Sequence, residues 1–257
     1  MEQVRGLKEE HIQCALFLAF SHEIQLLASV GGHGSQQELM VWNWRKGRRI
    51  AHHLAFAGKV EEVEFNPGTT GRLVTVGHRH VRFWKLRGNV LQASSGIFAG
   101  AAQDDQLSVS HLPEGLVVTG TSGGHLYIWL KEKMERSIND VHPGGVLATE
   151  IYPGGLITGG RDGTIKLFDR KLNHLSTIPE APSLVYEKAG PVHSLSVWKE
   201  KVLVGTEYNE IWCVTLHHSG DLAANCLVQG HGQGELWGLA THPTRHLAIT
   251  AGDDQSV

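Results

Sequence analysis

The amino-acid sequence predicts an all-β protein built from about six repeats of one strand pattern, the last of them truncated. Three observations support this class. An apolar run containing a small or hydroxyl side chain recurs along the chain, and a glycine-bearing turn joins it to a second run that ends on a large apolar residue. Glycine supplies 31 of the 257 residues, which indicates many tight turns. No segment keeps the 3.6-residue period of a capped helix for more than a few turns.

The repeated strand pair can be followed along the chain in order. A further alternating stretch precedes the pair, as in Val60–Phe65 and Leu236–Ala240, and we expect these stretches to be the innermost strands. The paired runs are Leu26–Gly31 with Leu39–Trp42, Leu73–Gly77 with Val81–Trp84, Val117–Gly120 with Leu126–Trp129, Leu156–Gly159 with Ile165–Phe168, Val202–Gly205 with Ile211–Val214, and Ala248–Gly252 with Ser256–Val257.

The spacing of the copies predicts a particular repeat architecture. In the first five copies the second run ends at positions 42, 84, 129, 168 and 214. These positions lie 42, 45, 39 and 46 residues apart, close to the roughly 40 to 45 residues of a WD-repeat propeller blade. Ten residues separate Thr119 from Trp129, and the next two copies keep that distance. We therefore predict a WD-repeat β-propeller, because strands buried between blades read as nearly continuous apolar runs. Its repeats are expected at residues 12–50, 58–92, 105–135, 142–180, 190–225 and 231–257.

Composition excludes several classes of protein. The net charge of −3 does not resemble the footprint of a nucleic-acid or membrane-surface protein. The longest strongly apolar run, Cys14–Phe20, is far shorter than the roughly 20 residues that span a bilayer. The first ten residues mix both charges, unlike a secretory signal. Three widely spaced cysteines without a Cys-x-x-Cys pair favour an intracellular chain. We expect binding to neither nucleic acid nor membrane.

Several motifs together resemble one known family. They are Leu39–Trp44, His80–Trp84, Gly123–Trp129, and Gly230–His231 followed by Glu235–His242. These segments look like the echinoderm microtubule-associated protein-like family, and the Glu-Leu-Trp-Gly-Leu-Ala stretch is the most distinctive of them. The resemblance implies a cytoplasmic, cytoskeletal, non-enzymatic protein with two packed propellers that bind tubulin and microtubules.

The chain also departs from that family's pattern. The family's hydrophobic motif in the first propeller and its coiled-coil segment have no counterpart here, so the sequence is expected to be an internal piece. The same resemblance places a possible junction between two propellers near Gly88 to Asp105, so the copies need not form one ring.

The WD-repeat resemblance further implies a buried network of hydrogen bonds. A histidine before the first strand bonds the turn aspartate and links, through Ser or Thr, toward the strand-end tryptophan, which gives buried polar groups partners. His142, Thr158 and Asp162 match this network in the fourth copy, which ends on Phe168 and so lacks the indole donor. In the sixth copy the matching residues are His231, Thr250 and Asp254.

Two groups of residues are candidates for binding a partner protein. The first places four cations within five residues directly after a strand end, and it is either a solvated hairpin loop or a contact for an acidic protein surface. The second lies in turns between second and third strands, which share one rim of a propeller, and its members are either ordinary turn residues or binding residues. The first group is Arg45, Lys46, Arg48 and Arg49, and the second is Arg79, Arg161 and Tyr208.

Catalytic and metal sites are not predicted. Gly120–Gly124 matches the Gly-x-Ser-x-Gly elbow of hydrolases, but the residues that follow predict a strand where the elbow needs a helix. The closely spaced histidines, such as His78 and His80, lack a cysteine or carboxylate at ligand spacing. We expect a non-enzymatic interaction propeller without a cofactor that binds tubulin and other proteins through its loop faces. The alternative is a generic WD-repeat scaffold without tubulin contact.

Overall fold

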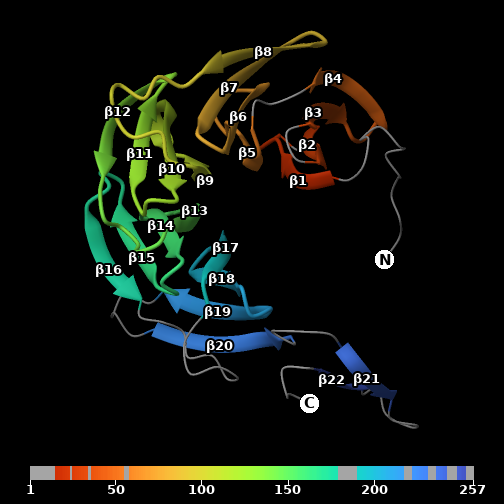
Figure 1. The fold of residues 1–257 in the computed structure, drawn as a ribbon, viewed down its shortest axis with the longest axis vertical. Helices are drawn as coiled ribbons and strands as arrows, with labels where there is room; N and C mark the ends of the chain where they lie inside the picture. Colours follow the sequence, from red (N-terminus) through yellow and green to blue (C-terminus); the bar gives the residue numbers. More distant parts are fainter. Residues whose placement is uncertain are drawn as a thin grey trace. The chain divides into compact units, whose positions relative to one another are not determined.

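The computed structural model of the chain contains two compact units, Met1–Val141 and His142–Val257, which we call unit 1 and unit 2 (Figure 1). Every regular element within the described residues is a strand, apart from one short 3-10 turn at Pro113–Gly115. This confirms the all-β class. The structure describes residues 15–23, 25–33, 36–54, 58–178, 190–216, 222–230, 236–241 and 248–252.

Unit 1 contains three four-stranded antiparallel sheets, and in each sheet the strands follow chain order as a meander. The first sheet is β1 (Ala15–Phe20), β2 (Leu26–His33), β3 (Gln36–Asn43) and β4 (Arg48–Leu54). The second is β5 (Val60–Phe65), β6 (Arg72–Gly77), β7 (His80–Arg87) and β8 (Val90–Ser95). The third is β9 (Gln106–His111), β10 (Leu116–Thr121), β11 (Leu126–Leu130) and β12 (Lys133–Ile138).

Unit 2 continues the same pattern with two further four-stranded meanders and one strand pair. The fourth sheet is β13 (Val146–Tyr152), β14 (Gly155–Gly160), β15 (Ile165–Asp169) and β16 (His174–Ile178). The fifth is β17 (Val192–Trp198), β18 (Lys201–Thr206), β19 (Glu210–Leu216) and β20 (Leu222–Gln229). At the position of the sixth repeat, β21 (Leu236–Thr241) pairs with β22 (Ala248–Gly252).

The repeats share an irregularity in strand register. In the second sheet Val60 pairs with Gly77, but the next pair joins Glu62 to Val76, so one residue of β5 bulges out. The strand pair β21–β22 has the same shift, between Leu236 and Gly238. The first, fourth and fifth sheets show it at the same place in their first strands. A shared bulge identifies the strand pair as the start of another copy of the repeat.

Apolar side chains pack consecutive sheets face to face. In unit 1, β5 lies beside both β1 and β9, so the first strands of successive sheets are neighbours. Phe65 and Trp84 of the second sheet share a buried cluster with Val41 of the first. In unit 2 the same arrangement joins Ile157 of the fourth sheet to Val204 of the fifth. Each fully buried side chain of this size contributes roughly 1.5 to 3 kcal/mol, so these clusters hold the blades together.

The connection between the second and third sheets is well packed. Ile97 forms a parallel bridge to β12: its N–H donates to the Glu132 carbonyl at 2.8 Å, and its carbonyl accepts from Met134 N–H at 3.0 Å. Phe98 is buried edge-on against Trp129, with ring centroids 5.0 Å apart. This connection therefore covers the beginning of the free edge of β12. The junction near Gly88 to Asp105 stays a prediction.

The described part of the chain contains no helix long and apolar enough to cross a membrane.

Candidate partner-binding edge

Hydrogen bonds from tryptophan side chains fix the strands that carry the turns of unit 1. In each of the first three sheets, the indole N–H of the strand-end tryptophan donates to a hydroxyl on the neighbouring second strand, and both groups are buried. The chain thus satisfies indole donors that water cannot reach. The pairs are Trp42 with Ser29 at 2.7 Å, Trp84 with Thr75 at 2.9 Å, and Trp129 with Thr119 at 3.0 Å.

In the fourth sheet a histidine network takes the place of the indole. Thr158 Oγ1 lies 2.8 Å from His142 Nε2, and Asp162 Oδ1 lies 3.0 Å from Nδ1. An ionised carboxylate only accepts, so Nδ1 carries the proton and Nε2 accepts the threonine hydroxyl. Burial lowers the pKa of His142, although the Asp162 charge opposes that shift. Phe168 is buried at the strand end and offers no indole donor.

The fifth sheet replaces these polar groups with apolar ones. Val204 and Val214 are buried at the positions of the hydroxyl and the tryptophan. Its own Trp212 instead donates to the buried Glu210 carboxylate at 3.1 Å. Of the network predicted for the sixth copy, His231 and Asp254 lie outside the described residues, and the side chain of Thr250 is not described.

The meander places the turns of each sheet alternately on two edges. Turns between first and second strands and between third and fourth strands share one edge, and turns between second and third strands share the other with the connections between sheets. In unit 1 the first of these edges is rich in cations, and we call it the basic edge. Its exposed charged residues are Glu23, Arg45, Lys46, Arg48, Arg49, Arg72, Arg87, Glu114, Lys131, Glu132 and Lys133.

The four predicted cations of the first group lie on this basic edge, in and beside the turn between β3 and β4. Two hydrogen bonds hold the turn: Lys46 N–H donates to Asn43 Oδ1 at 2.9 Å, and Gly47 N–H donates to the Trp44 carbonyl at 3.2 Å. Gly47 adopts a left-handed φ of 63°, which costs glycine little. The Arg45 guanidinium lies 5.3 Å from the centre of the Trp44 ring. The four cations therefore lie in and beside a short turn whose backbone is held by hydrogen bonds.

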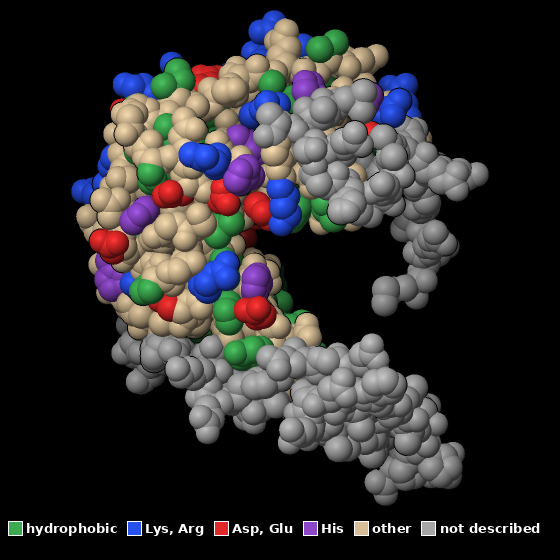
Figure 2. All heavy atoms as spheres, in the orientation of Figure 1, with side chains coloured by type: hydrophobic (Ala, Val, Ile, Leu, Met, Phe, Trp, Pro, Cys, Tyr) green, Lys and Arg blue, Asp and Glu red, His purple; other side chains and the backbone are tan. Residues whose placement is uncertain are grey.

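Arg79 lies on the opposite edge of unit 1, in the turn between β6 and β7. Its Nε donates to the Gln103 carbonyl at 3.2 Å. Beside it, His78 Nδ1 lies 2.8 Å from Asp105 Oδ1. Figure 2 shows acidic, basic and histidine side chains interspersed on the face toward the viewer. Arg79 and the Arg45–Arg49 turn therefore do not form one surface.

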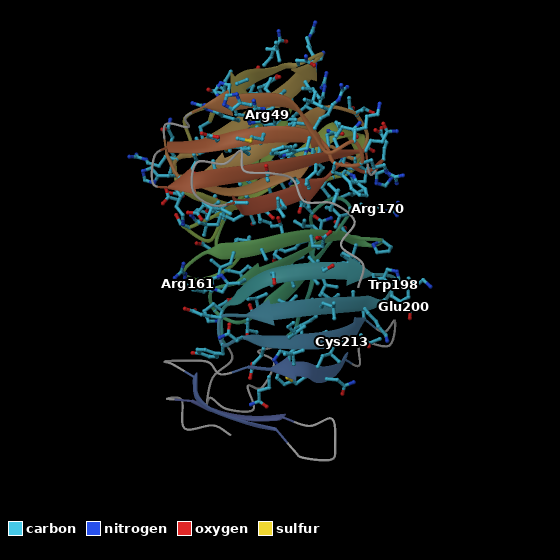
Figure 3. All side chains as sticks on the ribbon, turned by 90° about the vertical axis from the view of Figure 1, so that its right-hand side faces the viewer. Arg49, Arg161, Arg170, Trp198, Glu200 and Cys213 are labelled. Atoms are coloured by element: carbon cyan, nitrogen blue, oxygen red, sulfur yellow. The ribbon has the colours of Figure 1, made fainter. Side chains whose placement is uncertain are left out.

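In unit 2 the remaining candidates lie in turns on a single edge. Arg161 is exposed between β14 and β15, and its N–H donates to the Gly145 carbonyl at 3.0 Å. Tyr208 is partly exposed between β18 and β19. Figure 3 shows Arg161 on the side of the unit opposite to Arg170 and Glu200. The turns of Arg170 and Glu200 correspond to those of the basic edge in unit 1.

Several contacts between distant residues were not predicted from the sequence. His111 Nδ1 lies 3.0 Å from Glu64 Oε2 across two sheets, and Val109 N–H donates to Glu62 Oε2 at 2.6 Å. The serine turn at Gly120–Gly124 joins β10 to β11, so a strand follows it. Among the described residues, no group of three or more His, Cys, Asp or Glu side chains is arranged to hold a metal ion.

Comparisons with known proteins identify relatives over most of the chain. A family model described as the first β-propeller of echinoderm microtubule-associated protein matches residues 1–214. Echinoderm microtubule-associated protein-like 2 of Mus musculus is 34% identical over 250 residues, which cover 95% of this chain and 37% of that protein. The 77 kDa echinoderm microtubule-associated protein of Lytechinus variegatus is 33% identical, over 87% of this chain and 33% of its own length. The chain thus spans about a third of these relatives.

A solved structure supports the fold alone. The β-propeller domain of Cps50 (Swd1) from Myceliophteria thermophila aligns with a TM-score of 0.68 at 16% identity. The alignment covers 96% of this chain and 82% of that domain. The propeller class predicted from the repeat period is therefore confirmed.

Proposed function

Because the chain belongs to the echinoderm microtubule-associated protein-like family, we propose that its propeller binds tubulin directly and without enzymatic activity. The contact is the turn that carries Arg45, Lys46, Arg48 and Arg49. The observation that carries this proposal is that hydrogen bonds hold the backbone of that turn, on an edge whose other exposed charges are mostly cationic. Such an edge attracts an acidic protein surface and steers its approach. Membership of this family supports the microtubule as the acidic surface that the turn contacts.

Cosedimentation with microtubules tests the proposal. The parent chain should pellet with microtubules, and pelleting should fall as salt rises, because the screening length shrinks to about 8 Å at physiological ionic strength. Exposed ion pairs contribute about 0.2 to 1 kcal/mol each, so replacing all four cations of the turn by alanine should weaken binding about fourfold or more. A variant that pellets as well as the parent would refute the assignment of the turn.

A matched control separates the turn from net charge. The control removes the same number of exposed cations from elsewhere in the chain, so both variants have the same formal charge. Tubulin binding through the turn predicts that this control keeps most of the parent's affinity. Equal losses in both variants would show that total charge alone governs pelleting. The control positions are Lys59, Lys171, Lys199 and Lys201, each replaced by alanine.

The alternative is a scaffold that assembles other proteins without touching tubulin. The mixed-charge edge around His78 and Arg79 favours such partners, because interspersed charges suit a specific polar interface. This alternative predicts that the parent chain does not pellet with purified microtubules at any salt concentration.

A further inference from the structure

Three exposed cations lie on one face of the second sheet, beside the basic edge. Arg72 of β6 and Lys85 of β7 are directly opposite each other in the strand register. Arg87 lies two residues beyond Lys85, so its side chain points to the same face. All three residues are exposed. The Cβ atoms of opposite residues lie about 5 Å apart and those of alternate residues about 7 Å apart, so the three form a compact group, which we call the second-sheet cations.

The second sheet has a packed neighbour on both sides. The face that carries the cations packs on the third sheet through Val74 and Phe83, the next pair along that face, which share a cluster with Trp129. The opposite face packs on the first sheet through Leu73 and Trp84. All three sheets belong to unit 1. The second-sheet cations therefore stay exposed even though both neighbouring blades are in place.

The cation pair is a departure from the repeat and not a requirement of it. Arg72 lies three residues before Thr75, the partner of the strand-end tryptophan, and the other four-stranded sheets have a strand pair at the same distance. None of these four pairs consists of two cations. Like charges directly opposite each other destabilise a sheet, so the fold alone gives no reason to place them there. The four pairs are Leu26 with Asn43, Leu116 with Leu130, Gly155 with Asp169, and Lys201 with Thr215.

The carboxylates of the second sheet do not neutralise this group. Glu61 forms an ion pair with Lys59 at 2.9 Å. The other two, Glu62 and Glu64, contact groups of the third sheet. Within the described part of the chain, none of the second-sheet cations forms a hydrogen bond or an ion pair through its side chain. Their charge is therefore open to an anionic group of a partner.

Hydrogen bonds between turns hold the first and second sheets together at the basic edge. The Thr70 hydroxyl, in the turn between β5 and β6, donates to the Glu23 carboxylate, in the turn between β1 and β2. Leu86 N–H donates to the Gly71 carbonyl at 2.7 Å, which ties the same turn to β7. The strands β4 and β8 also lie side by side. One packed unit thus carries both the second-sheet cations and the Arg45–Arg49 turn.

We propose that the second-sheet cations are a second contact for the partner that binds the Arg45–Arg49 turn, so that its acidic surface spans two blades. Packed sheets lie about 10 Å apart, a separation that one protein surface covers. The close spacing of the cations requires two or more neighbouring carboxylates on the partner, because a single carboxylate neutralises one charge of three. This inference rests on the proposed function, and it adds a cluster of carboxylates to what the partner must present.

Cosedimentation of a triple variant with microtubules tests the inference. Arg72→Leu and Lys85→Asn introduce the residues that the first sheet carries at this register, and Arg87→Ala removes the third cation. The loss of three exposed cations should weaken binding about threefold or more. The thermal midpoint should stay equal or rise, because the opposed like charges are gone. Adding the four alanine substitutions of the turn should multiply the two losses, since the two contacts are separate.

A matched control and a second probe complete the experiment. The control removes three exposed cations of unit 2, so it has the same formal charge as the triple variant and should keep most of the parent's affinity. Fluorescently labelled poly-L-glutamate provides a carboxylate-rich probe that does not depend on tubulin. In fluorescence polarisation the triple variant should bind this probe about threefold more weakly than the parent and the control. The control substitutions are Lys171→Ala, Lys199→Ala and Lys201→Ala.

The outcomes separate this inference from the proposed function. A triple variant that pellets like the parent, while the turn variant loses binding, overturns the inference and leaves the proposed function intact. A parent chain that never pellets overturns tubulin as the partner; a loss of poly-L-glutamate binding specific to the triple variant then supports the acidic contact, and equal binding by all three chains overturns it. A lower thermal midpoint or a lost dimer in the triple variant, with pelleting unchanged, shows a role within the chain or between copies and also overturns the inference.

Discussion

Replacing Thr119 with valine should strongly destabilise unit 1, although the two side chains have nearly the same size. The Thr119 hydroxyl is completely buried, donates to Gln106 Oε1 at 2.5 Å and accepts the Trp129 indole N–H at 3.0 Å. Gln106 is held in turn, because its Nε2 donates to the Asp104 carbonyl at 2.9 Å. Valine has nearly the same shape but offers no polar atom. The substitution therefore leaves a buried donor and a buried acceptor without their shared partner.

The expected size follows from the two orphaned groups. Each unsatisfied buried polar group costs about 1 to 3 kcal/mol, so Thr119→Val should lower the free energy of unfolding by roughly 2 to 6 kcal/mol. Removing the indole donor as well, with Trp129→Phe, should make the valine substitution less costly. The fifth sheet supports this reasoning, because Val204 and Val214 occupy the two positions together and are both buried. Replacing both partners by apolar groups is much less costly than removing one.

Urea unfolding of the full chain, followed by circular dichroism and fluorescence, measures these energies for the parent, both single variants and the double variant. The four values form a double-mutant cycle that isolates the coupling between the two side chains. Thr69→Val, in an exposed turn, is the matched control and should change stability by less than about 0.5 kcal/mol. A cost below about 1 kcal/mol for Thr119→Val, or strict additivity in the cycle, would refute the reasoning.

Three further predictions concern protonation and packing. Burial lowers the pKa of His142 in the folded chain, whereas the unfolded chain binds this proton below about pH 6.5. The free energy of unfolding should therefore be constant above that pH and fall below it. Urea unfolding between about pH 8 and 5 can measure this change. Burial, helped by the Asp104 charge, raises the pKa of Tyr127 to about 12, so its phenolate absorbance should appear above the range of exposed tyrosines in an alkaline titration. In Gly159→Ala the new methyl group would meet the stiff, buried side chain of Val192, and the thermal midpoint should fall by an amount corresponding to about 1 to 3 kcal/mol.

The sequence predicted the features that depend on residues close together in the chain. The strand pairs follow from apolar runs and glycine turns, because a hairpin is specified by its own side chains and the turn between them. Thr119 and Trp129, which lie ten residues apart in the recurring register, are joined in the structure by a hydrogen bond from the indole N–H to the threonine hydroxyl. The fourth-sheet residues His142, Thr158 and Asp162, singled out by the WD-repeat resemblance, lie within hydrogen-bonding distance as one network.

Contacts between sheets could not be predicted in this way. Asp105 lies beside His78, and Glu64 beside His111, only because one sheet packs on the next. No local period records such a pair, since the two residues come from separate copies of the repeat. The ring contact between Phe20 and Trp44 depends on folding in the same way, because β1 and the turn after β3 meet only in the folded sheet.

The sequence by itself therefore determined the blades, their order and the local register of their strands, because hydrophobic alternation and turn chemistry act over a few residues. The tertiary structure decided which charged turns share an edge and which apolar side chains stay exposed. Burial and charge proximity are properties of the packed sheets: a phenylalanine at the same repeat position is buried at Phe65, where the first sheet packs on it, and exposed at Phe20.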